Sequence, residues 1–315
     1  MSALPIRPPE ARLSGDTATF LEARESYAGW MTATQADPAV AGPFDLLAPP
    51  KRSLLRDAWG EVRATARYSH LLRLLVSSSL RTENSNTVFG FFWWVLDPLL
   101  QMMVYVIFIG VILGRAGPDY PIFILTAIIS WELLVKATQG SAAATLRKER
   151  AMRQVAFPKT ILPLSQVIGA AAHFMFAFGV LLVVAVPFGI YPSAYALLVL
   201  PIALVQVTLT TGIALFISAL NVFFRDTGKI ITYVFRMGFY LSPVLYPVTV
   251  VPDRFRPIYD LNPFVTLFDA YRAIVMEHSL PDLSSLGIVA GGSIVVLALG
   301  YLFFVRLQTS FAKLV

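Results

Sequence analysis

Long runs of apolar residues, separated by polar connectors, dominate the chain from residue 91 onward. Each run approaches the ~20 apolar residues that a helix needs to cross a hydrocarbon core of ~30 Å. Because only a helix satisfies its own backbone hydrogen bonds in lipid, the pattern predicts six membrane-spanning helices. They cover Phe91–Leu113, Pro121–Ala143, Leu162–Val186, Ala194–Leu220, Ile230–Tyr246 and Leu283–Val305.

The composition favours a membrane protein over the alternative, a large soluble protein with buried helices. Of the 315 residues, 57% are hydrophobic and 14% are charged, and the mean hydropathy is +0.68. We therefore expect an all-α integral membrane protein. The fifth run is short because Ser242-Pro243 interrupts it, and the connector 247–281 keeps apolar pieces. We expect external re-entrant helices between spans 5 and 6, where protein has to cover the irregular backbone.

The chain before the first span divides into two parts. Residues 1–50 are rich in Pro, Ala, Ser and Thr, without the apolar run of a signal peptide, and predict a mostly disordered cytoplasmic leader. Residues 51–90 predict an amphipathic helix in the membrane interface and a gate segment, because Trp59 and Val62 recur at helical spacing opposite Arg63 and Arg67. The alternative is an amphipathic helix packed on its own domain. Residues 91–315 form the six-span domain.

Basic residues fix the expected orientation of the spans. They gather before the first span and in the second and fourth connectors, whereas the first connector has one and the third has none. The rule that basic loops stay inside places both termini in the cytoplasm. The net charge of +6 therefore needs no nucleic acid as a partner. The basic residues of the cytoplasmic connectors are Lys51, Arg52, Arg56, Arg63, Arg67, Arg73, Arg81, Arg147, Lys148, Arg150, Arg153, Lys159, Arg225 and Lys229.

The second connector carries more than a basic loop needs. A short basic helix with Met152, Val155 and Phe157 on an apolar side should stop before Pro158, since a residue preceding proline avoids helical geometry. These apolar residues in a basic loop indicate a docking element for a cytoplasmic partner. A further candidate is the turn Phe224-Arg-Asp226, although Arg225 and Asp226 alternatively form only a local pair.

Four local patterns carry a family resemblance. They are Thr87-Val-Phe-Gly-Phe-Phe-Trp-Trp-Val-Leu-Asp-Pro98; Phe157-Pro-Lys-Thr-Ile-Leu-Pro163; Phe224-Arg-Asp226 with Ser242-Pro-Val-Leu-Tyr-Pro247; and Leu261-Asn-Pro-Phe264 followed by Arg272. In this order, over residues 52–315, they resemble the permease subunit of ATP-binding-cassette exporters for lipid-linked polysaccharides. Thr87 and Phe89 depart from the family's Ser and Leu, and the leader is longer than the family core.

The resemblance implies two permease copies, two separate ATPase subunits, membrane lipid and a lipid-linked polysaccharide as partners. ATP and Mg would bind the ATPase, because this chain has no Gly-x-x-x-x-Gly-Lys-[Ser/Thr] phosphate loop and would not be an enzyme alone. No cofactor is expected on this chain. The implied ATPase-coupling residues are Arg147, Lys148, Glu149, Arg150, Met152, Val155, Phe157, Pro158, Lys159, Arg225 and Asp226.

Aromatic residues gather in the first and fifth spans, where the family has its channel. Their flat faces suit the C–H faces of sugars, so they predict a glycan path, although aromatics at span ends also form interfacial belts. The candidates are Phe91, Phe92, Trp93, Trp94, Tyr233, Phe239 and Tyr240. Arg73 and Arg81, before the first span, would meet a lipid diphosphate or, alternatively, anionic lipid.

Ionisable residues inside the spans are costly and therefore draw attention to Asp97, Glu132 and Lys136. Glu132 and Lys136, four residues apart, predict a structural pair on one helix face rather than a proton relay. The three histidines show no metal spacing, the chain has no cysteine, and we expect neither a metal site nor catalytic residues.

The leading interpretation is a polysaccharide export permease of the bacterial inner membrane, with a cell-wall galactan or an O antigen as cargo. The alternatives are a permease for a drug or small lipid, and a proton-coupled secondary transporter using Glu132 and Lys136. A membrane glycosyltransferase is disfavoured because no acidic cluster is present to hold a metal-bound sugar donor.

Overall fold

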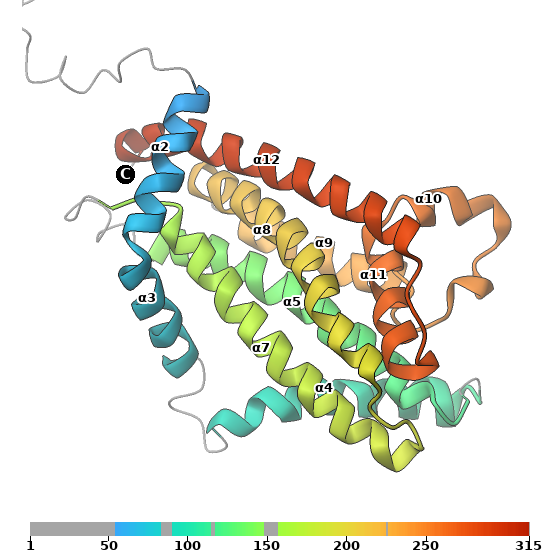
Figure 1. Ribbon diagram of the computed structural model, residues 1–315. Coiled ribbons are helices and arrows are strands. Elements are labelled where there is room, and N and C mark those ends of the chain that lie inside the picture. Colours follow the sequence, from blue (N-terminus) through green and yellow to red (C-terminus); the bar gives the residue numbers. More distant parts are fainter. Residues whose placement is uncertain (1–53, 83–89, 115–116, 148–156, 225, 315) are drawn as a thin grey trace, which may run out of the picture. The chain divides into compact units, whose positions relative to one another are not determined.

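A computed structural model describes residues 54–82, 90–114, 117–147, 157–224 and 226–314 (Figure 1). The expected leader lies outside these residues. All regular elements of the described residues are helical, as the apolar pattern predicted. They are α2 (Leu54–Arg67), α3 (Ser69–Thr82), η2 (Gly90–Phe92), α4 (Trp93–Tyr105), η3 (Val106–Ile112), α5 (Tyr120–Arg147), α7 (Ile161–Ala185), η4 (Val186–Phe188), η5 (Ala194–Leu198), α8 (Val199–Phe223), α9 (Thr227–Leu241), η6 (Val248–Val250), η7 (Asp253–Phe255), α10 (Arg256–Asp260), α11 (Pro263–Arg272), η8 (Ala273–Glu277) and α12 (Leu283–Leu314).

Five helical segments of the described residues are long and apolar enough to cross a membrane. They are Trp93–Ile112, Tyr120–Leu146, Ile161–Phe188, Ala194–Phe223 and Leu283–Gln308, close to five of the six expected ranges. The expected range Ile230–Tyr246 corresponds to α9, which has only 15 residues and a length of about 22 Å. It ends at Leu241 because Ser242 is extended before Pro243.

Helix α5 lies at the centre of the helical unit and packs against α7 and α8 (Figure 1). In its most apolar 18-residue stretch, 78% of the residues are buried, against 6% in the first span. Between Ile124 and Trp131 α5 is apolar or small and uncharged on every side, and neighbouring helices surround it there. The core therefore forms on α5, whereas α4 and η3 leave large apolar side chains such as Val104, Val111 and Ile112 exposed.

Helices α8 and α12 run side by side at an unusually close approach (Figure 1). A Cβ atom placed on Gly300 would lie 2.1 Å from the backbone oxygen of Gly212, so no larger residue fits there without a shift. Small residues that let two backbones approach are a common basis of helix association in membranes. The hydrophobic pattern does not reveal this pair, because Gly212 and Gly300 lie in different helices.

The predicted amphipathic segment forms two helices, α2 and α3, that meet at Tyr68. Helix α2 packs against α12, and α3 packs against α7. The guanidinium of Arg63 lies 5.5 Å from the ring centroid of Trp59, and Trp59 is 60% exposed. An exposed tryptophan beside a cation is the arrangement expected of a helix at a membrane surface.

Between α9 and α12 the chain forms the short helices α10 and α11. Asn262 caps α11, because its side-chain oxygen accepts a hydrogen bond from the Phe264 amide at 3.0 Å. Asp282 caps α12 and accepts hydrogen bonds from Ser284 and Ser285, which lower the pKa of its carboxyl from 3.8 to about 2. These caps fix where each helix begins.

Candidate functional site

The end of the predicted docking loop is anchored to helices α2 and α12. Pro158 is buried and Phe157 is partly buried. Thr160 is buried, and its hydroxyl lies 2.9 Å from that of Thr65 on α2. The ammonium of Lys159 donates to the backbone carbonyl of Gln308 on α12 at 2.9 Å, and desolvation lowers the pKa of this ammonium.

The rest of the predicted coupling set is only partly described. Asp226 is exposed in the turn before α9. Lys148, Glu149, Arg150, Met152, Val155 and Arg225 lie outside the described residues, as does the side chain of Arg147. The described residues thus place the loop's end against α2 and α12, and a displacement of the loop would act on both helices.

A buried asparagine, which the sequence analysis missed, holds the turn between α8 and α9. Asn221 donates from its side-chain amide to the carbonyl of Ala142 on α5 at 3.1 Å. Its side-chain oxygen accepts from the Gly228 amide at 2.9 Å. The turn that contains Asp226 is therefore attached to the C-terminal part of α5. Only a hydrophilic residue at the end of an apolar helix hinted at this role.

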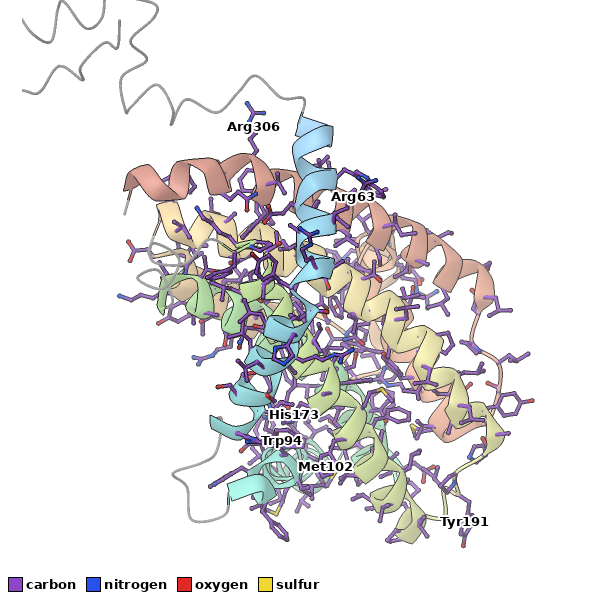
Figure 2. All side chains as sticks on the ribbon, turned by 60° about the vertical axis from the view of Figure 1, so that its left-hand side comes forward. Arg63, Trp94, Met102, His173, Tyr191 and Arg306 are labelled. Carbon is purple, nitrogen blue, oxygen red and sulfur yellow. The ribbon has the colours of Figure 1, made fainter. Side chains whose placement is uncertain are left out.

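The predicted glycan-path aromatics divide into exposed and buried sets. Phe92, Tyr233 and Tyr240 are 69%, 64% and 51% exposed, whereas Trp94 and Phe239 are each 8% exposed. Trp93 is partly buried, and the side chain of Phe91 lies outside the described residues. Trp94 packs on His173 of α7 with ring centroids 4.7 Å apart, and Figure 2 shows the two side by side.

Phe239 belongs to a larger group of rings, the Trp131 cluster, which the sequence analysis missed. The Trp131 ring meets those of Phe235, Phe239, Phe264 and Phe268 at centroid distances of 5.2 to 6.4 Å. Tyr105 of α4 stacks on Phe239 at 5.5 Å. The first and fifth predicted spans thus touch through their aromatic residues at the level of Trp131.

Polar side chains on one side of α5 contact side chains of neighbouring helices. Glu132 and Lys136 are paired at 3.2 Å, as their spacing predicted. Gln101 of α4 donates to Glu132 at 2.8 Å, and the ammonium of Lys136 lies 3.1 Å from Nε2 of His173 on α7. Further along, Gln139 donates to Thr232 of α9 at 3.2 Å. The pair is therefore tied to two neighbouring helices.

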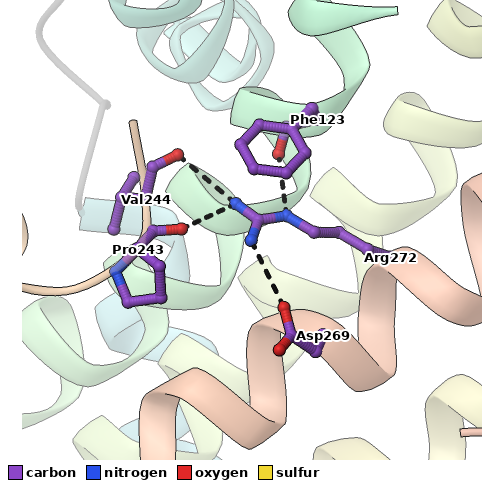
Figure 3. Close-up of polar contacts among 5 residues, drawn as sticks. All are labelled: Phe123, Pro243, Val244, Asp269 and Arg272. Carbon is purple, nitrogen blue, oxygen red and sulfur yellow. Dashed lines mark hydrogen bonds and ion pairs between the residues drawn. The ribbon is translucent and has the colours of Figure 1, made fainter. Parts of the chain in front are cut away.

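Arg272 forms a buried anchor at the other end of α9 (Figure 3). Its guanidinium donates to the carbonyls of Pro243 at 2.8 Å and of Val244 and Phe123 at 3.4 Å. The same group lies 3.4 Å from the Phe123 ring centroid and 3.6 Å from the Asp269 carboxylate. Arg272 therefore ties the segment after α9 to α11 and α5. Arg73 and Arg81, in contrast, are exposed on α3.

Comparison with known proteins assigns the class of this helical protein. Residues 77–276 match the ABC-2 type transporter family, and the chain belongs to that family. An O-antigen export system permease protein of Myxococcus xanthus is 32% identical over 75% of this chain and 92% of its own length. One of Klebsiella pneumoniae is 26% identical over 78% and 94%. A polysialic acid transport protein of Escherichia coli is 20% identical over 70% and 87%. The family resemblance read from the motifs is thereby confirmed.

Proposed function

We propose that this chain is the membrane subunit of an ATP-driven exporter that moves a lipid-linked polysaccharide, such as a cell-wall galactan or an O antigen, out of the cytoplasm. The supporting observation is that relatives named for O-antigen export align over 92% and 94% of their own lengths. The family match over residues 77–276 includes the first five expected spans and the docking loop, which are parts that transport requires.

The working assembly in this proposal contains two copies of the chain and two ATPase subunits, which hold ATP and Mg. The exposed face of α9 is evidence that a second copy or a water-filled path lies beside this helix. This face exposes Ile230, Tyr233 and Met237 together with the charged Arg236. A cation that faced lipid there would be costly, so the face needs protein or water against it.

The proposal places the chain in the bacterial inner membrane with six crossings and both termini in the cytoplasm. Helix α9 alone is too short to cross the membrane, and residues 242–246 would complete the crossing. A single cysteine at Leu261 should then react with an impermeant reagent only from outside, and one at Phe224 only from inside. The chain has no other cysteine to interfere. Reaction of both from the same side would contradict six crossings.

A substitution in the predicted docking loop tests whether the chain requires an ATPase. We expect the Phe157→Asp variant to lose co-purification with its ATPase, because a carboxylate would replace the apolar side chain offered to the partner's cleft. The matched control is Leu261→Asp, which changes an 85% exposed leucine in the external connector. Pull-down from detergent followed by ATP hydrolysis measures both. A chain that needs no ATPase and moves solute down a proton gradient would overturn the proposal.

The same proposal gives the exposed aromatics and arginines their roles. Phe92, Tyr233 and Tyr240 would offer ring faces to the sliding glycan, and Arg73 and Arg81 would hold the lipid diphosphate at the inner leaflet. Export should fall in the Arg73→Ala and Arg81→Ala variants. Unchanged export in both would assign these arginines to anionic lipid instead.

A further inference from the structure

Helix α5 changes character halfway along its length. Between Ile124 and Trp131 every side chain is buried. From Glu132 toward the cytoplasmic end, partly exposed residues recur at the three- and four-residue spacing of one helix face. This face, the α5 stripe, consists of Glu132, Val135, Lys136, Gln139, Gly140, Ala143 and Leu146. At 1.5 Å per residue it is about 21 Å long, more than half of a ~30 Å hydrocarbon core.

Polar groups from three neighbouring helices border the α5 stripe. Gln101 of α4 bonds to Glu132, His173 of α7 contacts Lys136, and Thr232 of α9 bonds to Gln139. On α7, the side-chain oxygen of Gln166 lies 3.1 Å from where a Cβ atom on Gly140 would be. The three polar residues of the stripe therefore contact polar groups of neighbouring helices rather than lipid.

The Trp131 cluster bounds the stripe on its external side. Trp131 directly precedes Glu132, and it is in contact with Phe235 and Phe239 of α9. Tyr105 of α4 stacks on Phe239. Aromatic packing thus joins α4, α5 and α9 where the exposed part of α5 ends, and the stripe extends from this point only toward the cytoplasm.

The charges on the stripe determine what it can bind. The side chains of Glu132 and Lys136 are 14% and 29% exposed. Ionised groups in a membrane segment face protein or water rather than hydrocarbon, so their exposed parts indicate water beside the stripe. The pair has no net charge, and it offers both an acceptor and a donor. Such a surface suits neutral hydroxyl groups better than a phosphate.

We propose that the α5 stripe lines a water-accessible path open to the cytoplasm, and that Glu132 and Lys136 bind sugar hydroxyl groups at the end of this path next to Trp131. This inference rests on the proposed function and adds a specific binding site to it. Tyr and Trp rings can stack on a sugar in any register, whereas a carboxylate and an ammonium at fixed positions hold one sugar unit at one depth. The site would therefore position the glycan beneath the closed Trp131 cluster.

Cysteine labelling tests the path directly. Val135→Cys and Ala143→Cys place a thiol on the stripe without touching the polar contacts. Leu299→Cys, at a residue 63% exposed on α12, is the lipid-facing control, and Ala137→Cys, at a fully buried residue, is the buried control. In inside-out vesicles a charged methanethiosulfonate reagent needs a thiolate, which forms in water and not in lipid. We expect the stripe positions to react at least about tenfold faster than either control.

The binding step is tested by protection of the same thiols. A soluble neutral galacto-oligosaccharide should slow labelling of Val135→Cys, and inorganic phosphate at equal concentration should not. The double variant Glu132→Gln with Lys136→Met should remove this protection, and its expression and its labelling rate without sugar are measured as controls. Protection by phosphate alone, or labelling that no sugar slows, would overturn sugar binding.

The outcomes also separate this inference from the proposed function. Labelling in vesicles requires neither export nor an ATPase, so a failed pull-down leaves its result intact. Conversely, an exporter with a confirmed ATPase can lack this site. Equal slow labelling of Val135→Cys and Leu299→Cys would overturn the path. A spontaneous disulfide between two Val135→Cys chains, without labelling, would overturn it as well and assign the stripe to an interface between copies.

Discussion

At the scale of single residues, Arg272 shows how a charge is stabilised inside an apolar bundle. Its side chain is 6% exposed, yet carbonyls from two separate segments, an aromatic face and a carboxylate surround it. A buried cation without such partners would be strongly unfavourable. The sequence singled out Arg272 after Leu261-Asn-Pro-Phe264, but it did not indicate the carbonyls of Phe123 and Pro243 as partners, because these are distant in the chain.

We predict that Arg272→Gln lowers the free energy of unfolding by about 3 kcal/mol, because it removes one side of a buried charged network. Arg272→Lys should recover only part of this loss, since an ammonium lacks the planar fork that reaches several carbonyls. Thermal unfolding in detergent measures both. The control is Arg256→Gln, which breaks an exposed pair with Asp253 and should change stability by less than about 1 kcal/mol. Equal effects at Arg272 and Arg256 would contradict the anchor.

At the scale of helices, the contact between α8 and α12 depends on two residues without side chains. Gly212 and Gly300 face each other so closely that their backbones touch. Glycine weakens a helix, and the close contact between the two helices compensates for that cost. Gly114, at the end of the first span, makes no such contact. Gly114 has a φ of +62°, and nothing lies within 4 Å of a Cβ placed on it.

We predict that Gly300→Ala destabilises the protein by about 1–3 kcal/mol, because a methyl group would overlap the Gly212 carbonyl and force α8 and α12 apart. Gly291→Ala on the same helix is the matched control, since nothing lies within 4 Å of a Cβ there. The control should unfold at the same temperature as the wild type or slightly higher. Thermal unfolding of the wild type and the two variants in one detergent measures the difference in stability. Equal midpoints would show that α8 and α12 separate without loss of stability.

At the scale of the whole molecule, the buried core and the proposed path share the same helix. Between Ile124 and Trp131 α5 is buried on all sides, and from Glu132 onward it leaves one face partly exposed. The aromatic residues of α9 reflect this division, because Phe239 is buried in the Trp131 cluster and the next residue, Tyr240, is 51% exposed. Neighbouring aromatics in the sequence therefore differ in burial, and only Tyr240 is left exposed for the proposed path.

We predict that Tyr240→Ala slows polysaccharide export while the assembly remains intact, because the exposed ring would contact the glycan and supports little of the core. Phe239→Ala should instead destabilise the protein by about 3–5 kcal/mol, since it opens a cavity beside Trp131. Export in cells and the amount of assembled complex in the membrane separate the two effects. Normal export by Tyr240→Ala would exclude this ring from the path.

The sequence by itself determined the properties that repeat along the chain. Apolar runs require helices in lipid, so the all-α class and five of the spans followed from composition and length. The pair of Glu132 and Lys136 followed from their separation of four residues on one helix. Four local motifs also identified the family, because each is a short pattern read within one segment.

The tertiary structure decided what depends on contacts between distant segments. Four sets of contacts join residues that are far apart in the chain. They are the Trp131 cluster, the hydrogen bonds of Asn221, the contact between Gly212 and Gly300, and the carbonyls around Arg272. It also decided that one face of α5, from Glu132 to Leu146, remains partly exposed. Burial is a property of neighbours, and periodicity within one helix does not specify which helices those neighbours are.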